Sequence, residues 1–510
     1  MIGGEVRENA LDWLAERQAR LGRPLRVLHI GNIANNAFNN ARIQRAHGIA
    51  ADVLSFDYYH IMATPEWEEA SFETAPADPS FPDWHSVDLN GYQRPRWFAS
   101  GPIADCCRYL AAEIEGSAEA DRLWRKLDHQ RFVRCSRSFR ARTELFRHKI
   151  GWKLAYERKK LEQRLGRNAD EPERQARAAG GLDFADLTRM WGERRGVAAF
   201  PAERGDLDYY WERFRHLAPL LARYDVIQGY ALDGLWPLLA GRRYAAYEHG
   251  TLRSLPFEKN PTGRATALCF GMADQVLVTN LDCLAAADRL GIESTRIVPL
   301  PHAFDDQRLR DFAVIHGDLR PPEEMLRFFA PARQDWLDGD PNLSKGNDRF
   351  LRAAALLAEE GGNFEIVAVR WGRDIAATEA LAAELGLASR LRWVEPMQKP
   401  ELWRHYLTSH LVIDQFALPA FGGVTFEALA LGRRVLNALD VPAAERFFGK
   451  APPLIVANSH EQIAAGLRQV AADAKDAAGL GARGASWIAD FHSASRIISL
   501  QAQAYRRLLT

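Results

Sequence analysis

The sequence predicts an α/β protein made of two Rossmann-like domains that face each other across a cleft. The chain has 510 residues, which is too long for one ordinary hydrophobic core. Short apolar segments alternate with helical stretches in two successive series, the first starting near residue 26 and the second near residue 327. Such alternation is typical of βα units, whose strands run parallel in one sheet. Two series therefore indicate two domains.

The first series opens with RVLHIG (26–31), a short apolar strand that ends in glycine. An asparagine-rich stretch follows and becomes helical, since asparagine caps helices and tolerates turns. ADVLSF (51–56) then gives a second strand. Ligands of doubly wound sheets bind outside the carboxyl ends of the strands, so the loop over residues 31–36 is expected at the edge of a cleft.

Later segments complete both series. Strands are expected at 224–230, 245–250, 273–280, 295–301, 327–331, 364–372, 390–396 and from 411, and helices at 348–360, 401–410 and 494–509. Residues 62–105 are rich in proline, aromatic and acidic residues and are expected to form an irregular loop, whereas 106–200 is expected to be helical.

These patterns predict domain boundaries. The first domain spans 1–304 and carries a loop and helical insertion over about 62–200. The second domain spans 305–490, and residues 491–510 are expected to form a C-terminal helix that packs back on the first domain.

Composition excludes several classes of protein. The net charge is zero, so the molecule as a whole is not built to bind nucleic acid. No apolar run is long enough to cross a bilayer, and the N-terminus lacks the apolar middle of a secretory signal. The five cysteines show neither CxxC nor zinc-site spacing, which indicates free thiols in a reducing compartment. We expect a cytoplasmic protein without a metal site.

One segment departs from this neutral balance. Over residues 131–167 lysine and arginine far outnumber glutamate, with aromatic and aliphatic residues interleaved. A basic helix of this kind can lie on an anionic membrane surface or hold an anionic acceptor. The apolar positions form no single stripe, however, which favours a helical hairpin packed on the main domain.

The segment 411–436 combines an apolar strand, a glycine pair and the start of a helix. The turn at Gly422 and Gly423 leaves backbone N–H groups at a helix N-terminus, where they can hold a phosphate. Glu427 is expected in about the first turn of that helix, and its carboxylate suits two neighbouring sugar hydroxyls. The alternative is an ordinary glycine-bounded helix start with an acid favoured by the helix dipole.

Four motifs between residues 296 and 436 together resemble a known family. They are RIVPLPHAFD (296–305), LSKGNDRFLRAA (343–354), FEIVAVRWGRD followed by RLRWVEPMQKPELWRHY (364–406), and FGGVTFEALALGRRVL (421–436). Their order and spacing resemble the nucleotide-sugar-binding domain of family-4 glycosyltransferases (glycosyltransferase group 1), which have the GT-B fold. The resemblance implies a hexosyltransferase-like enzyme whose donor is a nucleotide sugar and which needs no further cofactor.

The resemblance also implies roles for residues of the donor site. Lys345 matches the lysine that binds the donor diphosphate, and Arg333, twelve positions upstream, is the candidate for the arginine that assists it. Glu427 matches the second glutamate of the family's E-x7-E motif, which accepts hydrogen bonds from the ribose. The alternatives are a solvated loop charge for Lys345 and a surface ion pair for Arg333.

The first glutamate of E-x7-E is replaced by Pro419, which has no side-chain acceptor. Asp414 or Gln415, at the end of the preceding strand, would then supply polar contacts to the donor. We interpret Pro419 as the trait of a subfamily that lacks the first glutamate.

Three residues of the first domain are further candidates by the same resemblance. His249, after the strand in AAYEHG, matches a histidine that relatives place at the reaction centre. Glu248 is expected to point to the opposite face. Asn32 and Asn35 lie in the first βα loop and are candidates for contacts with an acceptor or a phosphate. The alternative for His249 is a histidine satisfied within its loop.

The leading hypothesis is a retaining, metal-independent glycosyltransferase acting on a glycan, lipid-linked or small-molecule acceptor. It would be cytoplasmic, with peripheral contact at the inner face of the membrane through residues 131–167. Two alternatives stay open. One is a non-catalytic binding or scaffold protein with the GT-B fold, motivated by Pro419, and the other is a synthase of a soluble disaccharide or sugar phosphate.

Overall fold

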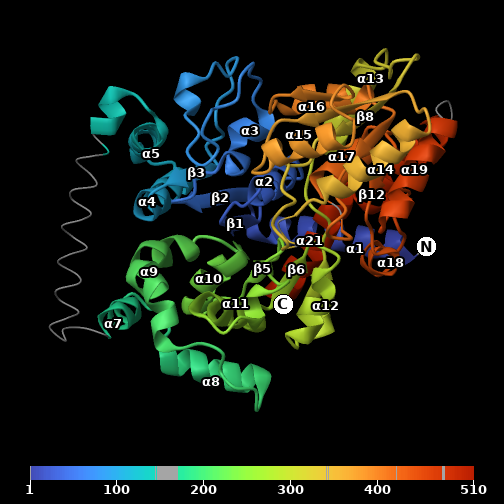
Figure 1. Ribbon diagram of the computed structural model, residues 1–510. Helices are drawn as coiled ribbons and strands as arrows, with labels where there is room; N and C mark the ends of the chain where they lie inside the picture. Colours follow the sequence, from blue (N-terminus) through green and yellow to red (C-terminus); the bar gives the residue numbers. More distant parts are fainter. Residues whose placement is uncertain are drawn as a thin grey trace. The chain divides into compact units, whose positions relative to one another are not determined.

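The computed structural model contains two compact units, each built on a parallel β-sheet (Figure 1). Unit 1 comprises residues 1–279, 283–303 and 498–510, and unit 2 comprises 280–282 and 304–497. The prediction of two Rossmann-like α/β domains is confirmed. The structure describes residues 2–143, 145, 170–340, 342, 344–420, 422–473 and 477–510.

The sheet of unit 1 has the strand order β3-β2-β1-β4-β5-β6-β7, and all its pairings are parallel. The order reverses between β1 and β4, which is the topological switch point where doubly wound sheets bind ligands. The strands are β1 (Arg26–Ile30), β2 (Ala50–Phe56), β3 (Phe98–Gly101), β4 (Val226–Tyr230), β5 (Ala245–Tyr247), β6 (Gln275–Val278) and β7 (Ile297–Pro299).

The sheet of unit 2 has the order β10-β9-β8-β11-β12-β13, also entirely parallel. Counted within the unit this is the Rossmann order 3-2-1-4-5-6, with the switch point between β8 and β11. The strands are β8 (Leu326–Ala330), β9 (Phe364–Val369), β10 (Leu391–Val394), β11 (Leu411–Ile413), β12 (Val435–Asn437) and β13 (Ile455–Val456).

Helices connect the strands of both sheets. Those of unit 1 are α1 (Ile2–Leu21), α2 (Asn36–Ala46), α3 (Pro65–Glu69), α4 (Ile103–Ile114), α5 (Glu119–Cys135), α7 (Glu171–Ala178), α8 (Phe184–Arg195), α9 (Asp208–Leu221), α10 (Leu235–Leu239), α11 (Pro261–Met272) and α12 (Cys283–Arg289). Those of unit 2 are α13 (Asp306–Ile315), α14 (Asn347–Glu359), α15 (Ile375–Glu384), α16 (Lys399–Leu407), α17 (Gly423–Ala430), α18 (Val441–Phe448), α19 (His460–Ala472) and α20 (Ala477–Phe491). The final helix is α21 (Ala494–Leu509).

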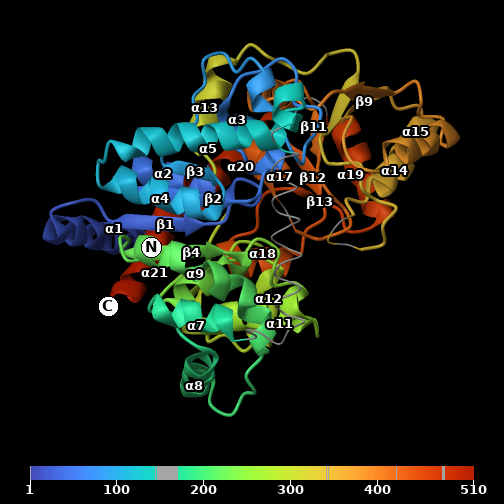
Figure 2. The ribbon, with the colours of Figure 1, turned by 90° about the vertical axis from the view of Figure 1, so that its left-hand side faces the viewer.

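Helices α4 and α5 pack together over β2 and β3 (Figure 2), and a buried cluster that includes Leu28, Leu110 and Leu127 joins these layers. One sequence prediction was wrong here. Residues 98–101 were expected within an irregular loop, but they form β3, whose four residues are all buried beside β2. A strand this short, covered on both faces, gives no alternation of apolar and polar residues.

The last helix joins unit 1 through a network of buried polar side chains. Gln44 Nε2 donates to Gln501 Oε1 at 2.9 Å and to the Tyr505 hydroxyl at 2.8 Å. That hydroxyl donates to Gln228 Oε1 at 2.8 Å, and Gln44 Oε1 lies 2.9 Å from His29 Nε2. These bonds satisfy polar groups that would be costly to bury alone, so they fix where α21 packs.

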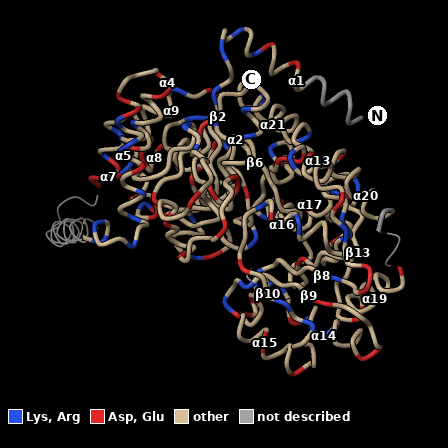
Figure 3. The backbone as a smooth tube through the Cα atoms, turned by 90° about the horizontal axis from the view of Figure 1, so that it is seen from above, with Lys and Arg blue, Asp and Glu red and all other residues tan. Residues whose placement is uncertain are grey.

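Charged residues of both signs are interspersed along the described chain (Figure 3). All five cysteines are buried and unbridged, which confirms the prediction of free thiols. Among the described residues, no helix has both the length and the hydropathy of a membrane span.

Candidate functional site

The switch point of unit 2 brings together two loops that are far apart in sequence. The loop after β8 carries Arg333 and Lys345, and the loop after β11 carries Asp414 and Gln415. Because β8 and β11 pair directly, their carboxyl ends lie side by side. All six residues that the sequence proposed for the donor site lie in these two loops or in the helix that follows β11, namely Arg333, Lys345, Asp414, Gly422, Gly423 and Glu427.

Lys345 is held against the end of β11. Its Nζ donates to Gln415 Oε1 at 2.7 Å, and its carbonyl accepts from Phe416 N at 2.9 Å. Gly346 makes this close approach possible, since its φ is +68° and an added Cβ would lie 3.1 Å from Ala417 N. The ammonium group is therefore held at the switch point by Gln415, near the carboxylate of Asp414, whose pKa its charge lowers.

Arg333 belongs to the same loop. Its Nη1 lies 3.3 Å from Asp335 Oδ2, and the Asp335 carbonyl accepts from Lys345 N at 2.6 Å. The side chain of Arg333 is half-buried, whereas that of Asp335 is buried. Asp335 thus connects the two cations proposed for the diphosphate, although twelve positions separate them in sequence.

Asp414 is buried and faces the N-terminus of α17. Its Oδ2 accepts from Thr425 Oγ1 at 2.6 Å, and the backbone N–H groups of Gly422 and Thr425 also donate to the carboxylate. Burial raises the pKa of Asp414, while Lys345 and these hydrogen bonds act in the opposite direction. The side chain proposed for a donor contact therefore caps the helix, and the Gly422 amide proposed for a phosphate is directed to that cap.

Glu427 lies just beyond the first turn of α17, close to where the sequence placed it. It is the fifth residue of the helix, so it belongs to the second turn. The carboxylate is buried, with Oε1 2.5 Å from Lys399 Nζ and Oε2 3.3 Å from the donating Trp403 Nε1. Both partners come from α16, and nothing in the sequence pattern singled them out. The role at a ribose stays a prediction, and it would require hydroxyl groups to share or replace the Lys399 contact.

Pro419, which stands where the resembled family has a glutamate, lines a pocket of about 500 Å³ beside the ends of β11 and β12. The charged residues of this pocket are Arg349 and Asp440. Arg349 Nη1 donates to the Phe416 carbonyl at 2.7 Å, and Asp440 N donates to the Pro419 carbonyl at 2.9 Å. The pocket is thus part of the same loop cluster as Lys345.

The switch point of unit 1 is more tightly filled. Asn32 Nδ2 donates to Asn35 Oδ1 at 3.0 Å and to the Ala63 carbonyl at 2.9 Å, and Asn35 Nδ2 donates to the Thr64 carbonyl at 2.9 Å. Asn32 Oδ1 also accepts from Phe38 N at 3.0 Å. Both asparagines are buried. These side chains, proposed for an acceptor or a phosphate, tie the first βα loop to the segment that follows β2.

His249 follows β5 at the same edge of the sheet. Its Nε2 is buried and has no hydrogen-bond partner among the described residues, and burial lowers the pKa of the imidazole. The Glu248 carboxylate accepts from the backbone of Gly250 and, at 3.2 Å, from Thr279 N. Glu248 therefore holds the loop, while His249 carries an unused nitrogen, as a side chain that meets a ligand would.

Sequence reasoning missed one acid at this edge. Asp233, just after β4, lies against Gly31 at the switch point, and an added Cβ on Gly31 would sit 2.4 Å from Asp233 Oδ2. Trp236 Nε1 donates to Asp233 Oδ1 at 3.0 Å, and burial raises the pKa of Asp233 to about 7. A carboxyl group that titrates near neutrality at a strand end is a candidate for moving protons. The sequence feature that could have indicated this acid is the Asp-Gly pair at 233–234, just after a predicted strand.

Within the described ranges, no three His, Cys, Asp or Glu side chains are grouped to hold a metal ion. Most of the basic segment 131–167 lies outside the described residues. Of the two basic residues at its start, Arg131 is buried and Arg134 is half-buried, 5.2 Å from the ring centre of Phe81.

No family model and no curated protein sequence matches the chain. One solved structure with partial likeness is HepE of Anabaena in complex with UDP and glucose. The two chains are 16% identical, the match covers 56% of this chain and 81% of HepE, and the TM-score is 0.43. A glycosyltransferase from Rickettsia africae shares 10% identity over 96% of this chain and 99% of its own, with a TM-score of 0.47. Sucrose-phosphate synthase from Thermosynechococcus elongatus shares 18% identity over 58% and 79%, with a TM-score of 0.40. Structural likeness at this level says nothing about the chemistry of the site.

Proposed function

We propose that the chain is a glycosyltransferase that takes a sugar from a nucleotide-diphosphate donor bound at the switch point of unit 2. The observation that supports this most directly is Lys345, fixed by Gln415 and the Phe416 amide at the carboxyl edge of a sheet in Rossmann order. Arg333 reaches the same loop through Asp335. Two cations at this position suit a diphosphate.

Transfer of the sugar leaves negative charge on the diphosphate. Lys345, Arg333 and the N-terminus of α17 would stabilise that charge as it develops, which is the work that a divalent metal does in other enzymes. We therefore propose a reaction without a bound metal. Glu427 would hold the ribose, with Lys399 sharing its carboxylate. Retention of the anomeric configuration is proposed from the sequence resemblance alone.

Unit 1 would supply the groups that meet the acceptor. His249 offers a buried nitrogen without a partner among the described residues, and Asp233 offers a carboxyl group with a pKa of about 7. Either group would accept or donate a hydrogen bond at an acceptor hydroxyl. The proposed acceptors are a glycan, a lipid-linked saccharide or a small molecule, with membrane contact through residues 131–167 in the lipid-linked case.

A second candidate is a binding protein that keeps the fold and has lost transfer. Two observations favour it: Pro419 offers no carboxylate, and the Glu427 carboxylate already pairs with Lys399. This candidate predicts that a nucleotide binds without turnover of any nucleotide sugar, or that none binds.

The test is thermal stability in the presence of UDP, GDP, ADP, dTDP or CMP, followed by release of that same nucleotide from the matching sugar donor. A nucleotide at 100 times its dissociation constant should stabilise the protein by about 2.7 kcal/mol. Lys345→Met should abolish the shift and lower turnover by about 100-fold. Lys450→Met, at an exposed lysine of the same unit, is the matched control and should change neither.

Binding without turnover would favour the scaffold candidate. A nucleotide shift and turnover that both survive Lys345→Met would refute the proposed donor site. Glu427→Gln is the better partner variant than Glu427→Ala, because the amide retains an acceptor for Lys399.

A further inference from the structure

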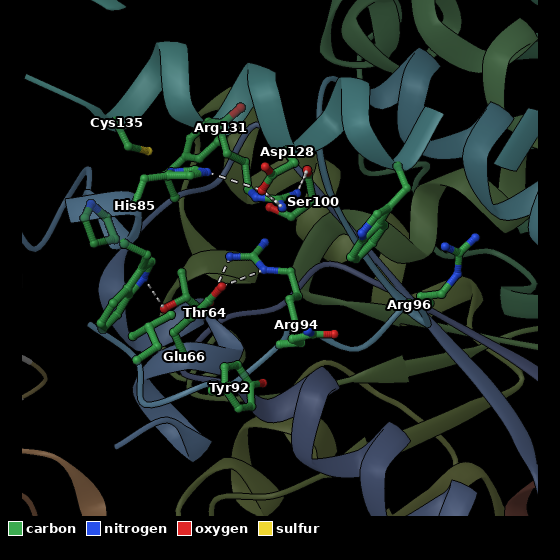
Figure 4. Close-up of a pocket in the computed structure, with 16 residues that line it drawn as sticks. Thr64, Glu66, His85, Tyr92, Arg94, Arg96, Ser100, Asp128, Arg131 and Cys135 are labelled. Atoms are coloured by element: carbon green, nitrogen blue, oxygen red, sulfur yellow. Dashed lines mark hydrogen bonds and ion pairs between the residues drawn. The ribbon is translucent and has the colours of Figure 1, made fainter. Parts of the chain in front are cut away.

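Unit 1 contains a polar pocket whose residues have no assigned part in the proposed reaction. Its volume is about 430 Å³, and its lining comes from the segment after β2, from α3, from the loop before β3 and from α5. Figure 4 shows Glu66 and Arg94 on one side and Arg131 and Asp128 on the other. Gln93 and Arg96, which are exposed, also line it, so the pocket reaches the surface.

Arg94 provides the main reason to look for a ligand. Its side chain is only 7% exposed, and it forms a two-pronged pair with Glu66, with Nε at 2.9 Å and Nη2 at 2.8 Å from the two carboxylate oxygens. The remaining nitrogen, Nη1, is buried and has no hydrogen-bond partner among the described residues. An unsatisfied buried donor on a charged group is costly, so a ligand that accepts from it would recover that cost.

Arg131 is a second buried cation in the pocket, with its side chain 9% exposed. Its Nη2 donates to Asp128 Oδ1 at 2.8 Å, and its Nη1 donates to the Ser100 carbonyl at 3.3 Å. Burial and then repulsion by Arg94 lower the pKa of Arg131 to about 10. The two guanidinium groups are therefore close enough to repel each other, and an anion between them would relieve that repulsion.

The rest of the lining suits a sugar ring. Arg96 is paired with Glu113 and Asp121, which lie outside the lining, so its charge is already balanced. Several aromatic residues form part of the wall, namely Tyr59, Trp84, Tyr92 and Trp124. Aromatic rings with a few converging polar groups are typical of sites for small ligands, and their faces pack well on the apolar face of a sugar ring.

The asparagines of the first βα loop hold this pocket in place. Asn35 Nδ2 donates to the Thr64 carbonyl at 2.9 Å, and Thr64 Oγ1 accepts from Trp84 Nε1 at 3.1 Å. Thr64 and Trp84 both line the pocket. The wall is thus braced against the core of unit 1, which keeps the cavity formed in the absence of a ligand.

We infer that this pocket binds an acidic sugar, with its carboxylate or phosphate group accepting hydrogen bonds from Arg94 Nη1 and lying near Arg131. A guanidinium group is the side chain best suited to either anion. Binding of the sugar does not depend on the proposed donor site. If the bound sugar is part of an acceptor, that role rests on the proposed function.

The test measures binding of glucuronate, glucose 6-phosphate, glucose and inorganic phosphate to the full chain by calorimetry. At least one acidic sugar should bind about tenfold or more tightly than glucose and than inorganic phosphate, since one charge-assisted contact gives about that factor. Preference for glucuronate identifies a carboxylate ligand, and preference for glucose 6-phosphate identifies a phosphorylated one. Binding of glucose with equal affinity, of phosphate alone, or of none would overturn the inference.

Substitutions in the pocket test whether the sugar binds there and not elsewhere on the chain. Arg94→Gln combined with Glu66→Gln removes both charges of the buried pair, so it avoids leaving one carboxylate unpaired, and it should abolish binding. Arg131→Gln should weaken binding about tenfold, whereas Arg125→Gln, at an exposed arginine of the same helix, should not. Undiminished binding in both pocket variants would refute the assignment.

The same samples distinguish this inference from the proposed function. If the double variant still gains stability from a nucleotide, its fold and donor site are intact, and any loss of sugar binding belongs to the pocket. If no nucleotide binds wild type but an acidic sugar does, the proposed function fails and the pocket inference stands.

Discussion

The two units share a strand order at their switch points but use those points differently. In unit 2, Lys345 and Gln415 meet there, and the turn at Gly422 is open, since an added Cβ would meet nothing within 4 Å. In unit 1 the switch point is filled, because an added Cβ on Gly31 would lie 2.4 Å from Asp233 Oδ2. Strand order alone therefore places a possible site, and the side chains of the loops decide whether it is open.

A pocket of unit 1 lies instead beside the outer strands β2 and β3. The pocket around Arg94 and Arg131 is built by the segment between these strands and by α5. The asparagines that close the switch point support its wall. An insertion next to a Rossmann-like sheet can thus provide a binding site away from the switch point.

The largest expected effect comes from placing a methyl group at the two switch-point glycines. Gly31→Ala should lower the free energy of unfolding by about 3 kcal/mol, because the positive φ is strained for alanine and the new Cβ overlaps Asp233. Gly422→Ala should change it by less than about 1 kcal/mol, since its φ is −139° and the site has room. Chemical denaturation measures both. Equal effects would contradict the contrast between a filled and an open switch point.

The ion pair between Glu427 of α17 and Lys399 of α16 gives the next effect. Glu427→Ala removes the carboxylate from the largely buried Lys399 and should cost about 3 kcal/mol of stability. Glu427→Gln should cost about 1 kcal/mol, because an acceptor remains for Lys399. Thermal and chemical unfolding report the difference.

The double variant Glu427→Gln with Lys399→Met serves as the control for this pair. If it regains the stability of wild type but not the nucleotide shift, Glu427 acts on the ligand as well as on Lys399. A nucleotide shift retained in both Gln variants would exclude the ribose role.

A buried histidine makes the stability of unit 1 depend on pH. His29 is buried, and burial lowers its pKa from 6.5 to about 4. The unfolded chain takes up a proton as the pH falls below 6.5, while the folded chain does so only near 4. Stability should therefore be lost as the pH falls through this window, by at most about 3 kcal/mol from this group.

The hydrogen-bond partners of His29 fit the neutral imidazole, with one nitrogen donating and the other accepting. Gln44 Oε1 accepts from Nε2, so Nδ1 is the acceptor for the Tyr230 hydroxyl at 3.0 Å. His29→Gln should flatten the stability profile between pH 6.5 and 4, measured by urea denaturation at several pH values. An unchanged slope would mean that other groups cause the pH dependence.

The smallest expected effect is at the position where the resembled family has its first glutamate. Pro419 is exposed, so Pro419→Glu should leave the free energy of unfolding within about 0.5 kcal/mol of wild type. The new carboxylate would face the pocket that Arg349 and Asp440 line. We expect a change of a few-fold in the KM of a nucleotide-sugar donor, measured with saturating acceptor. No change in any kinetic constant would place Pro419 outside the donor site.

The order of the elements was predictable because it depends on neighbours along the chain. The apolar runs at 26–31 and 364–372 and the amphipathic segment at 494–509 correspond to β1, β9 and α21. The Lys-Gly pair in LSKGND also indicated a cation at a tight turn, and Gly346 does have a positive φ. The short strand β3 was missed, because four buried residues carry no period.

The sequence by itself therefore determined two α/β series and a lysine at a glycine turn, since periodicity and turn chemistry are local properties. Only the tertiary structure decided that Lys399 pairs with Glu427, that Asp233 lies against Gly31, and that Arg94 and Arg131 share one pocket. Each of these contacts joins segments that are brought together by packing and burial. Electrostatic and steric effects act through space, so no pattern along the chain could have shown them.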